Sequence, residues 1–176
     1  TKIDLVKDIL ELDVDDIQFQ PDVIWASPPC TTFSIASCGH HWNAPDDEGN
    51  RKPKTKEAEI GLLLLEKTIW IMNELQPKNY VIENPRGLMR KMGAVEYLTR
   101  HTVTYCQYGD NRMKPTDIWT NLPWTPRPMC KNGMPCHEAA PRGSRTGTQG
   151  LKGAYERSKV PYELCKEILE VINETV

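Results

Sequence analysis

The length and composition of the chain limit the classes of protein to which it can belong. Its 176 residues are enough for one domain with a hydrophobic core, and 39% hydrophobic and 26% charged residues are typical of soluble globular proteins. No apolar run approaches the roughly 20 residues of a membrane-spanning helix, and the first residues do not resemble a signal peptide. Six cysteines in such a chain favour thiol chemistry or metal binding over disulfides, so we expect a cytoplasmic protein.

The net charge is −2, but the charged residues are unevenly distributed along the chain. Residues 1–85 hold 8 Lys/Arg against 15 Asp/Glu, a net −7, and residues 86–159 hold 13 against 5, a net +8. The last segment, 160–176, holds 1 against 4, a net −3. A basic central segment indicates a surface that faces a polyanion. Basic side chains that only decorate a loop-rich region would give the same pattern.

The first half of the chain predicts a strand–helix–strand unit. Residues 3–18 mix apolar and acidic positions and fit a strand end that runs into a turn. The apolar run at 21–27 is typical of a short strand buried on both faces, and a polar loop follows it at 37–55. Apolar residues then recur at three- and four-residue steps over residues 56–75, which predicts a helix, and residues 79–84 predict a second strand.

The second half of the chain is less regular. Residues 101–109 fit a further strand, whereas residues 110–159 form a loop-rich, basic segment with little periodicity. A C-terminal helix begins after Pro161, because this proline suits a first helical turn and an apolar stripe follows it. We expect these elements to form one domain over residues 1–176.

Cys30 and Glu83 occupy corresponding places in the strand–helix–strand unit. Such units almost always contain parallel strands joined by a right-handed crossover, so both strands end at the same edge of the sheet. Cys30 follows the first strand and Glu83 ends the second, so we expect them together at the edge where open α/β sheets bind ligands. A thiolate can act there as a nucleophile while a carboxylic acid donates a proton. A small buried cysteine and a loop-capping glutamate are the alternative interpretation.

The motifs around these two residues resemble those of the DNA (cytosine-5) methyltransferase family. They read SPPCTTFS (27–34) and VIENPRG (81–87). The family carries its nucleophile on a Pro-Cys loop and its base-contacting acid in a Glu-Asn pair that ends a later strand. The resemblance implies the Rossmann-like α/β fold of S-adenosylmethionine-dependent methyltransferases, with a mostly parallel sheet and a loop-rich basic insertion at 110–159. It also implies a bacterial or phage protein.

The resemblance implies a reaction as well. Cys30 attacks C6 of a cytosine in DNA while Glu83 engages N3 of the same ring. C5 of the ring then takes a methyl group from S-adenosylmethionine, and loss of the C5 proton with elimination of Cys30 completes the cycle. Because C6 cannot be reached inside a stacked duplex, the base must be flipped out at a cost of a few kcal/mol.

Weaker matches assign further residues by the same resemblance. KDIL (7–10) and SKVPYEL (158–164) match segments that contact the cofactor, and QYGDNRMKP (107–115) matches a Tyr-Gly and basic segment at the substrate. The cofactor-binding residues implied are Asp8, Pro28, Ser158 and Val160. The residues implied at the nucleic acid are Asn84, Arg86, Arg112 and Lys114.

The sequence departs from the family pattern in its cofactor half. No glycine occurs before Gly39, so the Gly-rich loop of the family has no counterpart and the first strands of the fold are expected to be missing. Thr31 and Ser158 stand where Gln and Asn are usual. An alternative hypothesis is therefore a DNA-binding remnant without catalytic activity. A third hypothesis is a thiol enzyme that acts on free pyrimidine nucleotides.

The segment CKNGMPCH (130–137) suggests a metal site. It places Cys130, Cys136 and His137 in one short loop, and thiolates with imidazole suit tetrahedral zinc. Candidates for the fourth ligand are Cys38, His40, His41 and Cys106. A bound zinc ion would pin a loop that has little core of its own. Unpaired loop thiols and a surface histidine are the alternative, because this Cys-Cys spacing is longer than is usual in zinc knuckles.

Overall fold

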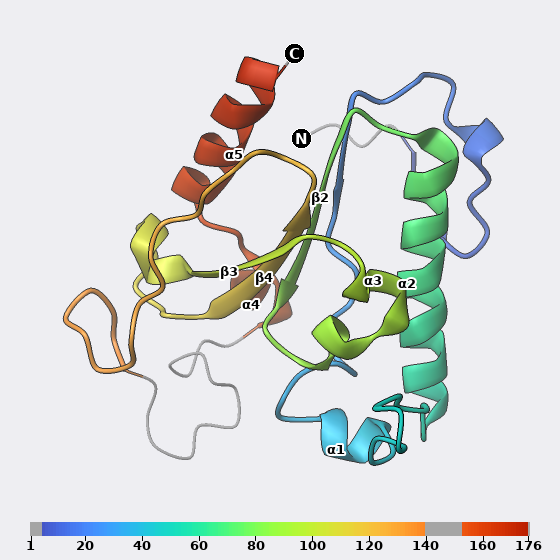
Figure 1. The fold of residues 1–176 in the computed structure, drawn as a ribbon, viewed down its shortest axis with the longest axis horizontal. Coiled ribbons are helices and arrows are strands. Elements are labelled where there is room, and N and C mark those ends of the chain that lie inside the picture. Colours follow the sequence, from blue (N-terminus) through green and yellow to red (C-terminus); the bar gives the residue numbers. More distant parts are fainter. Residues whose placement is uncertain (1–4, 140–152, 176) are drawn as a thin grey trace.

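The structure, a computed structural model, describes residues 5–139 and 153–175. Its centre is a four-stranded sheet whose strands lie in the order β1 (Val23–Ala26), β2 (Asn79–Pro85), β4 (Pro115–Thr120) and β3 (Arg100–Thr104). Helix α2 (Lys56–Leu75) lies on one side of the sheet and helix α5 (Tyr162–Thr175) on the other (Figure 1). The protein is therefore an α/β structure of three layers.

The sheet is mixed, which corrects the prediction of a mostly parallel sheet. β1 and β2 are parallel, as predicted, with Ala26 opposite Ile82 and α2 as the crossover between them. The pairs β2–β4 and β3–β4 are antiparallel. A parallel connection needs a crossover of about a dozen residues or more. The link between β3 and β4 spans only residues 105–114 and contains a single short 3-10 helix, so these strands fold back on each other.

Helix α2 has the bounds that the sequence predicts, because its ends carry clear signals. Thr55 caps the start by accepting a hydrogen bond from the main-chain N–H of Ala58. Gln76 ends the helix in a left-handed conformation, and Pro77 follows it. The buried face of α2 packs with Phe33, Ile82 and other side chains in one core cluster. This cluster fixes the parallel pair and the loop between β1 and α2.

Helix α5 covers the opposite face of the sheet. Its residues Leu164, Ile168 and Ile172 are buried in a second core cluster that also contains Val81 of β2. Because side chains alternate along a strand, Val81 and Ile82 supply the two clusters from neighbouring positions. Burial on both faces explains why the centre of β2 has two apolar residues in succession, Val81 and Ile82.

Two parts of the second half differ from the predictions. The strand expected at 101–109 ends at Thr104, and residues Tyr105–Tyr108 form the 3-10 helix η3 instead. β4 lies inside the segment predicted as loop. It contains the fully buried Asp117, whose carboxylate accepts hydrogen bonds from Arg90 Nε at 2.9 Å and Thr102 Oγ1 at 2.8 Å. Partners from two other segments thus allow an acidic residue inside a central strand.

The other elements are short. They are η1 (Val14–Asp16), α1 (Cys38–His41), η2 (Leu88–Lys91), α3 (Gly93–Glu96) and α4 (Ala154–Ser158). Of the helices in the described residues, none combines the length and the apolar character that crossing a membrane requires.

Candidate active site

The loop after β1 holds Cys30 in a stiff and tightly turned segment. Pro28 and Pro29 follow the strand, and each fixes its own φ angle and lacks a main-chain N–H donor. The chain then turns at once, because the main-chain N–H groups of Phe33 and Ser34 donate to the carbonyl oxygen of Cys30 at 3.1 and 3.0 Å. Cys30 itself is half-buried. Its thiol is therefore held in place and still accessible.

A buried hydrogen bond ties this loop to the end of β2. Nδ2 of Asn84 donates to the carbonyl oxygen of Pro28 at 2.7 Å. The parallel register of β1 and β2 makes this bond possible, since both strands end at the same edge. The turn after β2 also joins the loop, where the main-chain N–H of Leu88 donates to the carbonyl oxygen of Phe33 at 2.7 Å. The two motifs that the sequence singled out are thus locked together.

Cys30 and Glu83 line the same cavity, as the sequence predicts. Its volume is about 310 Å³, at the lower end of the range of about 300–1,000 Å³ for small-molecule sites. The walls come from the loop after β1, the end of β2, the residue before β4, and α4. They include Pro28, Cys30, Thr31, Glu83, Asn84, Lys114, Arg157 and Ser158.

Glu83 is held by a buried tyrosine that does not itself line the cavity. Glu83 is 5% exposed, and the hydroxyl of the fully buried Tyr105 donates to its Oε1 at 2.9 Å. Burial, and after it the charge of Glu83, raises the pKa of Tyr105 well above its ordinary value, so the phenol stays protonated and keeps donating. Glu83 thus lines the cavity with one of its carboxylate oxygens held by this hydroxyl.

Lys114 brings a cation to the same cavity. Its Nζ donates to the carbonyl oxygen of Arg157 at 2.8 Å and lies 4.5 Å from the centre of the Tyr105 ring. Burial lowers the pKa of Lys114, and the charges of Glu83 and Cys30 act against this change. The backbone of Lys114 has a φ of 25°, a left-handed conformation that non-glycine residues rarely adopt. Strained residues of this kind are concentrated at functional sites.

Asn84 offers an unused acceptor at the cavity. The residue is 1% exposed, and its Oδ1 has no hydrogen-bond partner in residues 5–139 and 153–175. A buried polar atom without a partner costs about 1–3 kcal/mol. Asn84 thus carries an unsatisfied acceptor next to Glu83, and both residues line the cavity.

Comparison with known proteins identifies the family. Residues 4–101, more than half of the chain, match the family model described as C-5 cytosine-specific DNA methylase. The chain belongs to this family. It is also 32% identical over 168 residues to a probable DNA (cytosine-5)-methyltransferase of Frog virus 3 (isolate Goorha), and the match covers 85% of this chain and 75% of the viral protein. The protein is therefore a DNA cytosine methyltransferase, and the segment that matches the family model includes Cys30 and Glu83.

A second cavity of this methylase adjoins the first. Its volume is about 370 Å³, and it shares Pro28 and Pro29 with the cavity of Cys30. Its other walls are mainly apolar, from Ile9, Trp25 and the α2 residue Leu64 among others. The predicted cofactor residue Asp8 precedes Ile9 and is exposed, and its Oδ1 accepts a hydrogen bond from the main-chain N–H of Leu10 at 2.9 Å. Pro28 is thus the one predicted cofactor residue that lines this second cavity.

Several other predicted residues lie outside the Cys30 cavity of the methylase. Arg112 is buried, forms an ion pair with Asp110, and donates from Nη1 to the carbonyl oxygen of Glu156 in α4 at 3.2 Å. Val160 lines a separate cavity with Arg112. Arg86 is exposed just after β2. Nucleic-acid contacts from Arg112 and Arg86, and a cofactor contact from Val160, stay predictions.

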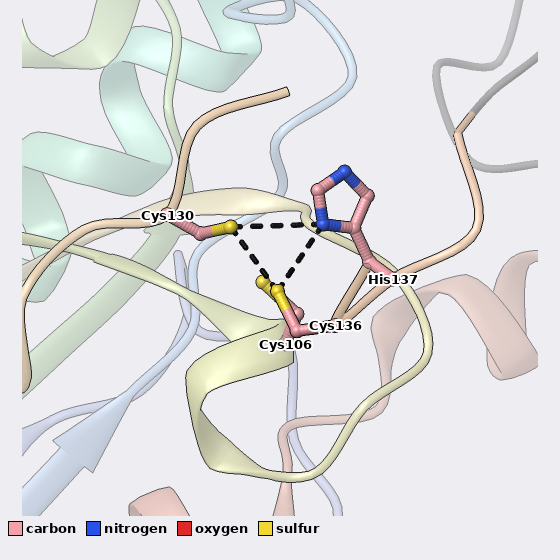
Figure 2. A group of neighbouring side chains, drawn as sticks. All are labelled: Cys106, Cys130, Cys136 and His137. Atoms are coloured by element: carbon pink, nitrogen blue, oxygen red, sulfur yellow. Dashed lines mark hydrogen bonds between the residues drawn. The ribbon is translucent and has the colours of Figure 1, made fainter. Parts of the chain in front are cut away.

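The predicted metal ligands do come together. Cys130, Cys136 and His137 meet Cys106 of η3, and the four ligand atoms lie within 4.8 Å of one another (Figure 2). Of the four candidates for the fourth ligand, Cys106 is the one that joins the group.

Sequence reasoning missed Tyr105 as a residue of the site. Tyr105 lies in the segment HTVTYCQYG, whose aromatic and β-branched residues are typical of a strand. No local sequence feature indicates that its hydroxyl is a hydrogen-bond partner of Glu83. The signal in the sequence that could have indicated it is its position two residues before the segment 107–115, which matches the substrate side of the family.

Proposed function

We propose that this methylase transfers a methyl group from S-adenosylmethionine to C5 of cytosine in DNA through a covalent bond between Cys30 and C6. The observation that carries the proposal is the shared cavity of Cys30 and Glu83, held together by the hydrogen bond from Asn84 to Pro28. The membership in the C-5 cytosine-specific methylase family supplies the substrate class and the position of methylation.

In the first step the thiolate of Cys30 attacks C6 of cytosine. A sulfur–C6 bond forms, and the electron pair of the C5–C6 double bond moves toward C5 and N3. Glu83 donates a proton or hydrogen bond to N3, which stabilises the charge that develops on the ring. Lys114 lines the same cavity and brings an amino group close to the reacting atoms.

Tyr105 positions the acid in this account. Its hydroxyl donates to Oε1 of Glu83 and limits rotation of the carboxyl group, so in this proposal Oε2 would engage the base. Oδ1 of Asn84 is then available to accept a hydrogen bond from the exocyclic amino group of cytosine. Glu83 and Asn84 would together recognise the edge of the pyrimidine that distinguishes cytosine from thymine.

The cytosine must be flipped out of the duplex to enter. Cys30 and Glu83 line a cavity between the loop after β1, the end of β2 and α4, and a base stacked inside a duplex could not enter it. The net charge of +8 over residues 86–159 supports DNA as the polyanion that this face meets. In this proposal Lys114, which lines the cavity, and the exposed Arg86 would contact phosphates beside the flipped nucleotide.

The second cavity fits part of S-adenosylmethionine. Its apolar walls suit the adenine ring, and Pro28 and Pro29, which separate it from Cys30, would hold the cofactor next to the base. When bound, S-adenosylmethionine supplies an electrophilic methyl group to C5 of the cytosine. Ile9 and Trp25 would pack on the ring, and Asp8, which precedes Ile9, would accept from its amino group. The parallel β1–α2–β2 unit supports a Rossmann-like fold for this half.

In the last step the C5 proton passes to solvent water, the sulfur–C6 bond breaks, and the C5–C6 double bond is restored. Cys30 leaves as the thiolate with which it began, so the cycle needs no reductant. Because a free thiolate is needed at every turnover, the proposal places the protein in a reducing compartment such as the cytoplasm.

The test is transfer of radiolabelled methyl groups from S-adenosylmethionine to cytosine-containing DNA. We expect Cys30→Ser to lose transfer, because a hydroxyl is a far weaker nucleophile than a thiolate at neutral pH. Cys38→Ser is the matched control, since this half-buried cysteine lies on α1 and does not line the cavity. Undiminished transfer by Cys30→Ser would remove the proposal.

Calorimetry with S-adenosylmethionine separates this proposal from a DNA-binding remnant, which is the alternative raised by the missing Gly-rich loop. We expect micromolar binding that weakens when Trp25 is replaced by alanine, because this side chain lines the apolar cavity. DNA binding without any cofactor binding would favour the remnant instead.

A further inference from the structure

A compact group of three sulfurs and one ring nitrogen lies at η3, the 3-10 helix that begins with Tyr105. The sulfur of Cys130 is 3.2 Å from that of Cys136 and 3.6 Å from Nδ1 of His137, and the sulfur of Cys136 is 3.5 Å from the same nitrogen. Figure 2 shows these three atoms as a triangle, with the sulfur of Cys106 next to that of Cys136. All four ligand atoms lie within 4.8 Å of one another.

These distances suit a tetrahedral metal ion. With Zn–S bonds of about 2.3 Å and Zn–N bonds of about 2.0–2.1 Å, tetrahedral ligand atoms lie about 3.5–3.8 Å apart. A disulfide is a poorer description, because its sulfurs would be about 2.05 Å apart, well below the separation of Cys130 and Cys136. Thiolates with imidazole favour zinc over the oxygen-seeking cations calcium and magnesium.

The segment that carries three of these ligands has few other means to hold its shape. Residues 131–136 are all exposed, and no helix or strand of the described chain occurs between β4 and residue 139. Two main-chain hydrogen bonds connect its ends to the body: Cys130 N–H to Thr104 Oγ1 at 2.8 Å and Glu138 N–H to the carbonyl oxygen of Asn111 at 2.9 Å. A metal ion shared with Cys106 would fix the loop between these two anchors.

We propose that Cys106, Cys130, Cys136 and His137 bind one Zn²⁺ as a closed structural site. Four protein ligands complete a tetrahedron and leave no position for water or substrate, so the ion stabilises the fold and takes no part in the chemistry. The three thiols lose their protons to solvent on binding, and His137 binds through Nδ1 as the neutral ring. The ion links the loop at 130–137 to η3, whose first residue is Tyr105.

The site has a consequence for catalysis that depends on the proposed function. Cys106 follows directly after Tyr105, whose hydroxyl holds Glu83. Loss of zinc frees the loop from η3 and loosens the support of Tyr105, so methyl transfer falls together with stability. Zinc binding itself does not depend on the proposed function, since Cys30 and Glu83 are not ligands.

The first test measures metal in the purified full-length chain. We expect about one zinc per chain by elemental analysis, and the cobalt form should show the intense visible bands of tetrahedral cobalt with thiolate charge transfer. Cys130→Ser and Cys136→Ser should each reduce bound zinc at least tenfold, while Cys38→Ser leaves one equivalent and so excludes Cys38 as a ligand. Cys30→Ser should also keep its zinc, so the metal site and the proposed reaction can fail separately.

The second test uses the wild-type chain alone, so it stands even if the variants do not fold. Removal of zinc by a chelator should lower the melting temperature, and added Zn²⁺ should restore it, whereas Mg²⁺ should not. Absence of stoichiometric metal from protein made with added zinc, an octahedral cobalt spectrum, or a Cys130–Cys136 disulfide found by mass spectrometry would each overturn the site.

Discussion

Asn84 donates a buried hydrogen bond of 2.7 Å to the carbonyl oxygen of Pro28, and this bond joins the Glu-Asn end of β2 to the loop that carries Cys30. The two segments are more than fifty residues apart in the sequence, yet this contact sets the distance between nucleophile and acid. The other atom of the same amide, Oδ1, is buried without a hydrogen-bond partner among the described residues. One side chain thus both joins the two segments and carries an unsatisfied acceptor beside them.

Replacing Asn84 by aspartate tests this relationship. The substitution keeps the shape but turns the donor into an acceptor that opposes the Pro28 carbonyl. We expect the free energy of unfolding to fall by about 1–3 kcal/mol and methyl transfer to fall more than tenfold. Urea unfolding and the radiolabel assay measure these effects. Asn121→Asp is the matched control, because its Nδ2 donates to the carbonyl oxygen of Lys78 at an exposed position. Equal effects at both positions would contradict a special role for Asn84.

Tyr105→Phe tests how Glu83 is held. The change removes only the hydroxyl that donates to Oε1 of Glu83 at 2.9 Å. A hydrogen bond to a charged group is worth about 1.5–3 kcal/mol, so kcat should fall roughly 10- to 100-fold with little change in the KM for DNA. Tyr80→Phe is the control, since this half-buried tyrosine lies at the start of β2, away from the cavity. A change in KM alone would show that Tyr105 does not act through Glu83.

Gly87→Ala tests the contact between the turn after β2 and the Cys30 loop. A Cβ atom at Gly87 would lie 2.4 Å from the carbonyl oxygen of Phe33, and this backbone atom cannot move without shifting the loop. We expect a loss of about 1–3 kcal/mol in stability and a loss of activity. Gly93→Ala should have little effect, because no atom lies within 4 Å of a Cβ built there. Comparable unfolding midpoints for the two variants would show that the loop adapts.

The ion pair of Asp110 and Arg112 makes stability depend on pH. Burial works to raise the pKa of Asp110, but hydrogen bonds and charge from Arg112 outweigh it and leave the pKa below its ordinary value of 3.8. Because the pKa of Asp110 is lower in the folded chain than in the unfolded chain, its ionisation stabilises the fold at pH values above the unfolded-state pKa. This stabilisation is lost as the pH falls through the folded-state pKa. The stability gap between wild type and Asp110→Asn should therefore be full at pH 7 and shrink below about pH 4. Urea midpoints across this range measure it, and a gap independent of pH would contradict the ion pair.

The sequence predicted the first half of the site well because its signals are local. An apolar run that stops at Pro28 and a short segment that stops at Pro85 mark the ends of two strands. The apolar stripe over α2 marks the crossover that makes them parallel. Parallel strands must end together, so the shared cavity of Cys30 and Glu83 followed from connectivity.

The structure of the second half of the chain depends on contacts between residues that are distant in the sequence. β4 was missed because Asp117 is disfavoured in strands unless Arg90 and Thr102 satisfy its carboxylate, and only the fold brings them together. Cys106 could not be selected as the fourth member of the Cys/His group because it lies more than twenty residues from Cys130 and no spacing rule connects them.

The most direct measurement of the central claim is covalent trapping on DNA that carries 5-fluorocytosine at the target position. Fluorine at C5 cannot leave as a proton does, so elimination of Cys30 is blocked and the sulfur–C6 bond persists. With S-adenosylmethionine present, we predict a complex that survives denaturing electrophoresis, whose DNA is attached to the peptide containing Cys30, and that does not form with Cys30→Ser. Methylation of ordinary cytosine DNA without any such complex, or a complex attached to another residue, would contradict the account.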